Sequence, residues 1–106
     1  MVKIVKVDIE AGKFDIKDVD IGTGDYKKIT AEIGCQYFEF VPLSPKYGAF
    51  VDEEPFRMKK SATVFGVRLR GCLLVFIRDD SSSGEEKYLD ATEEDLAAVV
   101  AKTIFL

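Results

Sequence analysis

A run of six apolar residues, Cys72–Ile77, constrains the fold of this chain more than any other feature. Its β-branched and aromatic members, Val75, Phe76 and Ile77, favour a strand over a helix. Both faces of such a strand are apolar, so both must be covered by other parts of the protein. We therefore expect residues 71–78 to form a strand in the middle of a sheet.

The composition is that of a single globular domain spanning residues 1–106. Of its residues 47% are apolar, and a chain of this length buries enough apolar surface for one core. The two cysteines, Cys35 and Cys72, lie in strand-like apolar segments and are interpreted as small buried thiols. A disulfide would require the fold to bring them together, and a reducing compartment disfavours it.

The absence of certain residue types and segments narrows the function. The chain has no histidine, which excludes histidine-based acid–base catalysis and most zinc sites. No segment is long and apolar enough to span a membrane, and the N-terminus does not resemble a secretory signal. We expect a cytoplasmic protein with no membrane contact.

The first half of the chain predicts two hairpins separated by a helix. Alternation over residues 2–9 and 14–21 predicts the first hairpin, with a slip at Asp18 that indicates a bulge or an early strand end. Helical spacing predicts a short helix over residues 25–33, ended by Gly34. Strands over 36–43 and 47–51 form the second hairpin.

The second half predicts further helices around the central strand. Met58, Ala62 and Phe65 recur near helical spacing, so we expect a short helix within residues 56–67, capped by Ser61 and ended by Gly66. A strand over 67–70 leads into the central strand, and residues 87–89 form an edge strand. A capping motif at Thr92 begins a C-terminal helix that extends to about residue 104.

This order of elements predicts an α+β fold. Hairpins followed by helices, without regular alternation of strand and helix, favour a largely antiparallel or mixed sheet of about five strands with two to three short helices.

Several segments spread over nearly the whole chain carry a family resemblance. They are Tyr26-Lys27-Lys28-Ile29 with Gly34, Phe38-Glu39-Phe40-Val41-Pro42-Leu43, Val51-Asp52-Glu53-Glu54-Pro55-Phe56, Ala62, Arg70-Gly71-Cys72-Leu73-Leu74-Val75, and Leu89-Asp90-Ala91-Thr92-Glu93-Glu94-Asp95. Together they resemble a family of short proteins from phages and Gram-positive bacteria that is known only as a domain of unknown function. The resemblance implies a cytoplasmic protein associated with a phage or mobile element, with no known activity.

Charge is distributed unevenly along the chain, whose net charge is −4. Residues 57–78 contain six basic residues and no acidic one, and they include all four arginines. This basic block supplies the candidate anion-binding residues Arg57, Lys59, Lys60, Arg68 and Arg70. Double-stranded nucleic acid is disfavoured as a partner, because phosphate contacts dominate that binding and the chain is acidic overall.

Arg68 and Arg70 point to the same face if residues 67–70 form a strand. Two adjacent guanidinium groups can hold a phosphate or a carboxylate bidentately. Backbone N–H groups at a helix start near Ser61 could add to the site, and Phe56 or Phe65 could stack on a base. The simpler interpretation is that these arginines pair with Asp52, Glu53, Glu54, Asp79 and Asp80.

These features favour a non-enzymatic binding protein that engages a protein partner or a small anionic ligand. No catalytic residue, metal site or cofactor is predicted. One alternative is a metal-dependent hydrolase or nucleotide-processing enzyme that uses acidic side chains such as Asp52, Glu54 and Asp79. Another is an acidic mimic of nucleic acid that inhibits a host enzyme. The apolar C-terminal pair, Phe105 and Leu106, either packs into the core or mediates formation of a homodimer.

Overall fold

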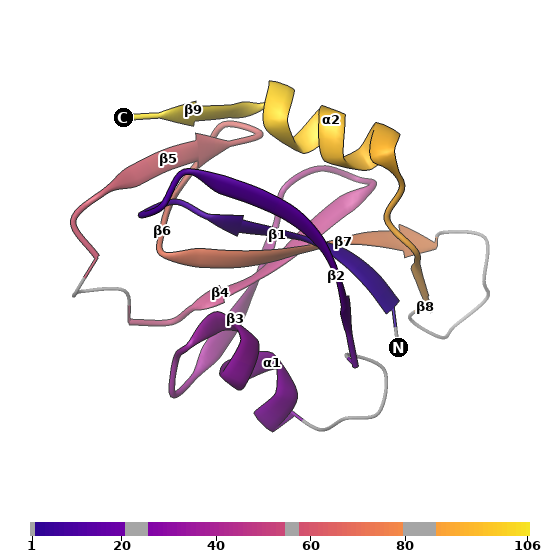
Figure 1. Ribbon diagram of the computed structural model, residues 1–106, viewed down its shortest axis with the longest axis horizontal. Coiled ribbons are helices and arrows are strands. Elements are labelled where there is room, and N and C mark those ends of the chain that lie inside the picture. Colours follow the sequence, from indigo (N-terminus) through magenta and orange to yellow (C-terminus); the bar gives the residue numbers. More distant parts are fainter. Residues whose placement is uncertain (1, 21–25, 55–57, 80–86) are drawn as a thin grey trace.

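The apolar run folds as the central strand β7, Cys72–Asp79, of the computed structural model, which describes residues 2–20, 26–54, 58–79 and 87–106 (Figure 1). Strand β1, Val2–Asp8, pairs with one edge of β7, and β4, Tyr47–Asp52, pairs with the other. Residues 73–77 of β7 have exposed fractions of 2% or less. The prediction of a strand buried in the middle of a sheet is confirmed.

Both predicted hairpins flank this central strand. Strand β2, Lys13–Val19, pairs with β1, and β3, Phe38–Pro42, pairs with β4. A short strand β8, Lys87–Leu89, pairs with the end of β7, as predicted. The large sheet therefore has the antiparallel order β2-β1-β7-β4-β3, with β8 added to β7.

The slip in the pattern at Asp18 reflects an early strand end. The register of β1 and β2 runs without interruption from the pair Val2–Val19 to the pair Asp8–Lys13, so these strands contain no bulge. The predicted end of this strand at residue 21 lies outside the described residues.

Alternation along β7 divides its side chains between two apolar layers. Leu74 and Phe76 face helix α1, Tyr26–Ile33, whose Ile29 and Ile33 are buried against them. The other face, from Leu73, Val75 and Ile77, packs against a small sheet and the C-terminal helix. Figure 1 shows α1 below the large sheet and these elements above it.

The small sheet corrects the prediction of a helix within residues 56–67. Strand β5, Ser61–Val64, pairs with β6, Val67–Arg70, through a turn in which Phe65 and Gly66 have φ angles of 50° and 78°. Two left-handed residues in a two-residue loop match the twist of a hairpin. The glycine interpreted as a helix end is a turn glycine. The chain then bends at Gly71, with a φ of 80°, and enters β7.

Helix α2, Glu93–Ala101, begins as predicted and ends earlier than predicted. Thr92 is the N-cap, and its hydroxyl accepts a hydrogen bond from the Asp95 N–H at 3.3 Å. The prediction that the helix extends to about residue 104 is wrong, because residues 103–105 form strand β9, Thr103–Phe105, beside β5. The small sheet has the order β6-β5-β9. The mixed architecture confirms the predicted α+β class.

Candidate binding face on the small sheet

Strand β6 presents two arginines on one face, as strand alternation predicts. Val67 and Leu69 are half-buried against the core, while Arg68 and Arg70 between and after them are exposed. Among the described strands, β6 pairs only with β5, so it is an edge strand. The two guanidinium groups therefore lie at the edge of the small sheet and are open to solvent.

The register of the small sheet aligns the arginines with residues from two other segments. Arg68 lies opposite Thr63, which lies opposite Ile104 on β9. Arg70 lies opposite Ser61, whose carbonyl oxygen accepts a hydrogen bond from the Leu106 N–H at 3.0 Å. We call this side of the sheet the outer face. Two rows cross it: Arg68–Thr63–Ile104 and Arg70–Ser61–Leu106.

The outer face changes chemically from one edge to the other. Its β6 edge is cationic, its middle carries the half-buried Thr63 and the buried Ser61, and its β9 edge is apolar. Ile104 and Leu106 have exposed fractions of 62% and 65%. A ligand that covered the whole face would contact a charged and an apolar edge about two strand spacings apart, or roughly 10 Å.

Neither Arg68 nor Arg70 forms an ion pair or a hydrogen bond with any of the described residues. The simpler interpretation required them to pair with nearby acids. Asp52 instead accepts a hydrogen bond from the Glu54 N–H at 2.9 Å, and neither Glu53 nor Glu54 forms an ion pair with these arginines. The side chains of Asp79 and Asp80 lie outside the described residues.

The other predicted anion-binding residues do not converge on this pair. Lys59 is exposed ahead of β5, and the Lys60 N–H donates to Oε1 of Glu10 at 2.9 Å. The predicted helix start at Ser61 is wrong, so its anion-binding N–H groups are absent from this site. Arg57 lies outside the described residues.

The aromatic side chains suggested for stacking are not open on this face. Phe65 packs against the ring of Tyr47, with centroids 5.2 Å apart, and Phe56 lies outside the described residues. Arg78, the last arginine of the basic block, lies over the ring of Phe40 at 5.0 Å. The site is thus a pair of arginines and not the whole basic block.

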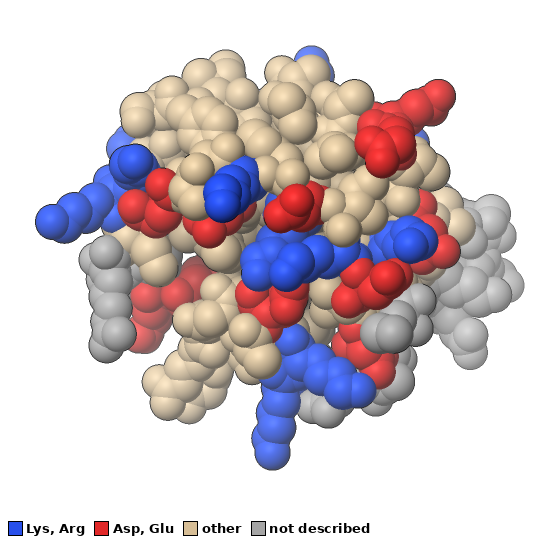
Figure 2. Space-filling view, in the orientation of Figure 1, with Lys and Arg blue, Asp and Glu red and all other residues tan. Residues whose placement is uncertain are grey.

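In the described residues, no observation favours the metal-dependent enzyme or the nucleic-acid mimic. Within the described part of the chain, no group of three or more His, Cys, Asp or Glu side chains could hold a metal ion. Cys35 and Cys72 are free and half-buried, and burial raises the pKa of each thiol, which disfavours the thiolate form. On the face that Figure 2 shows, acidic and basic side chains are interspersed, in contrast to the continuous negative face that a nucleic-acid mimic requires.

Sequence reasoning missed a buried polar cluster that joins α2 to the large sheet. The Tyr47 hydroxyl donates to Oδ1 of Asp95 at 2.7 Å, and Nζ of Lys46 lies 3.4 Å from the same oxygen. Burial alone would raise the pKa of Asp95, but hydrogen bonds from Tyr47 and Thr92 and the charge of Lys46 outweigh it and hold that pKa below its usual value. The capping motif predicted the contact between Asp95 and Thr92, but it did not predict that Asp95 also bonds to Tyr47 of β4.

Comparison with known proteins identifies no relative. A scan of family models and searches of curated proteins and of solved structures find no match to this chain. The resemblance to a phage and Gram-positive family therefore stays a prediction. Neither α1 nor α2, the helices of the described residues, is long and apolar enough to cross a membrane.

Proposed function

We propose that this protein is a non-enzymatic binding protein whose Arg68 and Arg70 engage an anionic ligand, most favourably an acidic, extended segment of a protein partner. The observation that carries the proposal is the exposure of both guanidinium groups on one edge strand, with no ion pair to any described residue. The resemblance noted above supports a cytoplasmic protein of phage or mobile-element type.

The main chain of β6 supports an extended partner. The main-chain carbonyl of Ser61 is bonded to β9. Since main-chain groups along β5 alternate between its two neighbours, the N–H and C=O groups of Ala62 and Val64 point toward β6. Their partners, Leu69 and Val67, therefore use their N–H and C=O groups within the sheet. The main-chain groups of Arg68 and Arg70 then point to the open edge, where an added strand can pair with them.

The spacing of the two arginines also fits an extended partner. Residues two apart on a strand lie on one face and are separated by about 6.6 Å. Acidic residues two apart on an added strand have the same separation, so each carboxylate can meet one guanidinium in a charge-assisted pair. A single phosphate can accept hydrogen bonds from both guanidinium groups. A small anion is therefore a second, less favoured ligand for the same two arginines.

The test measures binding of a six-residue peptide of alternating glutamate and valine by titration calorimetry at low ionic strength. A glutamine–valine peptide controls for charge, and inorganic phosphate tests a small anion. The double variant Arg68→Ala with Arg70→Ala is expected to weaken peptide binding by about tenfold or more, because each lost charge-assisted hydrogen bond contributes on the order of 1 kcal/mol at an exposed site.

A matched control removes two other exposed cations, Lys13→Ala with Lys27→Ala, which changes the net charge equally and lies outside the small sheet. It is expected to bind the peptide nearly as well as the wild type. Equal binding by the arginine variant, or an equal loss in both variants, would remove the outer face from the proposal.

A further inference from the structure

Strand β9 is the only edge strand among the described strands whose sequence contains no charged residue. Edge strands are usually protected from pairing with other chains by charges, prolines or bulges. The segment 103–105 contains only Thr103, Ile104 and Phe105. The other edge strands, by contrast, all carry charge: Lys13, Asp15, Lys17 and Asp18 in β2, Glu39 in β3, Arg68 and Arg70 in β6, and Lys87 in β8.

Exposed apolar side chains lie in and beside β9, next to the exposed Lys102 that precedes it. Val100 on α2, Ile104, Phe105 and Leu106 have exposed fractions of 44–65%. Figure 2 shows a mostly uncharged area along the top of the molecule, over β9 and the end of α2, whereas charged side chains gather across the middle. Clustered exposed apolar residues of this kind mark interaction surfaces.

The hydrogen bonds to β5 determine which main-chain groups of β9 are open. The Leu106 N–H donates to Ser61, and the Lys102 carbonyl oxygen accepts from the Phe65 N–H, each at 3.0 Å. Alternate residues of an antiparallel strand face the same neighbour, so Ile104 also faces β5. The N–H and C=O groups of Thr103 and Phe105 therefore point to the open edge.

We propose that a second copy of this chain pairs with this edge, antiparallel to β9 and related by a two-fold axis at Ile104. Thr103 of each copy then exchanges both of its main-chain hydrogen bonds with Phe105 of the other copy. Ile104 meets Ile104 of the partner subunit directly, at the non-hydrogen-bonded position where side chains are closest. The two small sheets become one continuous sheet of six strands.

The occupant is a second copy because β9 is complementary to itself and the opposite edge is not. An uncharged strand with symmetric donors and acceptors pairs with its own image in a closed, two-fold arrangement. Two copies joined through β6 would instead place Arg68 and Arg70 near the same arginines of the other copy. Pairing through β9 leaves both pairs of arginines at the outer edges of the joined sheet.

The expected dimer is a weak one. A specific interface buries about 800 Å² on each partner, or about an eighth of the 6493 Å² accessible surface of this chain. Three residues of strand supply only part of that area, so Val100 and Leu106 must contribute as well. The dimer should therefore dissociate on dilution.

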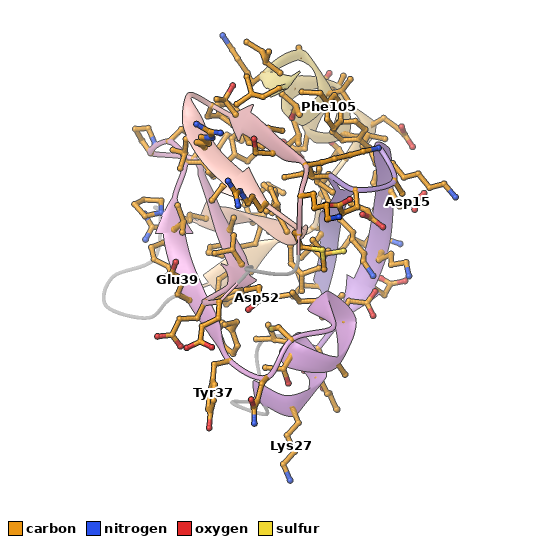
Figure 3. All side chains as sticks on the ribbon, turned by 90° about the vertical axis from the view of Figure 1, so that its left-hand side faces the viewer. Asp15, Lys27, Tyr37, Glu39, Asp52 and Phe105 are labelled. Atoms are coloured by element: carbon orange, nitrogen blue, oxygen red, sulfur yellow. The ribbon has the colours of Figure 1, made fainter. Side chains whose placement is uncertain are left out.

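The first test is sedimentation of the 106-residue chain over a range of concentrations. We expect a monomer–dimer equilibrium in the wild type, weakened by about tenfold or more in Ile104→Lys, because two lysines would lie directly opposite each other. The control is Tyr37→Lys, since Tyr37 has nearly the same exposed fraction, 63%, and lies at the opposite end of the molecule from Phe105 (Figure 3). Circular dichroism verifies that both variants are folded.

The second test measures the register by disulfide trapping, in a background with Cys35→Ala and Cys72→Ala. At the two-fold axis, Ile104→Cys places two Cα atoms about 4.5 Å apart, within the range that a disulfide spans. Leu106→Cys is the matched control: it is equally exposed, but the two copies of this residue lie about 13 Å apart in this register. Mild oxidation is expected to produce a covalent dimer of the first variant only.

Three results would overturn the proposal: a monomer at the highest concentration, a dimer that Ile104→Lys does not weaken, or equal trapping at residues 104 and 106. The proposed function is tested separately. Arg68→Ala with Arg70→Ala is expected to dimerise like the wild type, so loss of peptide binding and loss of the dimer are distinguishable.

Discussion

The large and the small sheet share one apolar layer but differ in how many of their faces are buried. Strand β7 of the large sheet has both faces covered, one by α1 and one by the small sheet with α2. Strand β5 of the small sheet buries Ala62 and Val64 on one side, while the flanking strands leave arginine and isoleucine side chains open on the other. The small sheet therefore has a buried inner face and a more open outer face, whereas β7 has no open face.

This difference has a physical origin. A strand with two apolar faces must be covered twice, and here the second cover is itself a sheet. The covering sheet then has one face left over, where polar, charged or apolar residues cost little folding stability. Exposed residues on that outer face can vary without disturbing the core.

The largest expected effects fall on the two faces of β7. Leu73 and Leu74 are both fully buried and point to opposite layers. Leu73→Ala and Leu74→Ala should each lower the free energy of unfolding by about 2–5 kcal/mol. Arg68→Ala should change it by less than about 0.5 kcal/mol, as is typical of exposed positions. Guanidinium denaturation measures all three.

If Leu73→Ala lowered the free energy of unfolding as little as Arg68→Ala, the small sheet and α2 would not be covering this face of the large sheet. If only Leu74→Ala lowered the free energy of unfolding by a large amount, the layer that contains α1 would provide most of the stability of the protein. Equal costs on both faces are the result expected of a sheet buried twice.

The large sheet could be predicted from the sequence because its signals are local. The run in β7 and the alternation in β1 and β2 are each contained in fewer than ten residues. Of the small sheet, only β6 was predicted, as a strand over residues 67–70. Strands β5 and β9 are too short for alternation to be distinguished from helical spacing, and Ala62 fits both patterns.

The end of α2 shows the same limit. Thr103 and Ile104 continue the helical spacing of Val99 and Val100, so the sequence alone favours a longer helix. The alternative is strand pairing with β5, which lies about forty residues away in the chain. Tertiary hydrogen bonds thus override the local pattern. For the candidate site, the common face of Arg68 and Arg70 was predictable, but their alignment with Ile104 was not.

An intermediate effect is expected at Gly48, where the large sheet has no room for a side chain. A Cβ atom at this position would lie 2.6 Å from Cζ of Phe76 and 2.7 Å from Cε2 of Phe40. Phe76 is buried and cannot yield easily, whereas the Phe40 ring is partly exposed. Gly48→Ala is expected to cost about 1–3 kcal/mol of unfolding free energy.

Phe40→Ala separates the two contacts at Gly48. If the clash with Phe40 dominates, Gly48→Ala should cost less in the Phe40→Ala background than in the wild type. A cost below about 0.5 kcal/mol in the wild type would show that both rings move aside, and that this layer of the large sheet is packed more loosely than its burial indicates.

A smaller expected effect than that at Gly48, and one that depends on pH, concerns the polar cluster that joins α2 and its attached strand β9 to the large sheet. Tyr47→Phe removes the 2.7 Å hydrogen bond to Asp95 and should cost about 1 kcal/mol near pH 7. The folded state holds the pKa of Asp95 below its usual 3.8. The stabilisation from the charged carboxylate is therefore complete above that value and is lost as pH falls through the lowered pKa.

Denaturation of the wild type and of Tyr47→Phe at pH 7 and at a series of pH values falling from 3.8 measures this loss. The difference between the two proteins should shrink at the lower pH values, because the protonated Asp95 no longer provides a charged acceptor. The pKa of Glu32 is also lowered, because the hydrogen bonds and charges from Lys17 and Lys6 outweigh its burial. The pH dependence of the wild-type stability would therefore contain contributions from both Asp95 and Glu32. Taking the difference between the two proteins cancels Glu32. A cost of Tyr47→Phe that does not change with pH would mean that the tyrosine stabilises α2 through packing, and that the contact between the layers is apolar throughout.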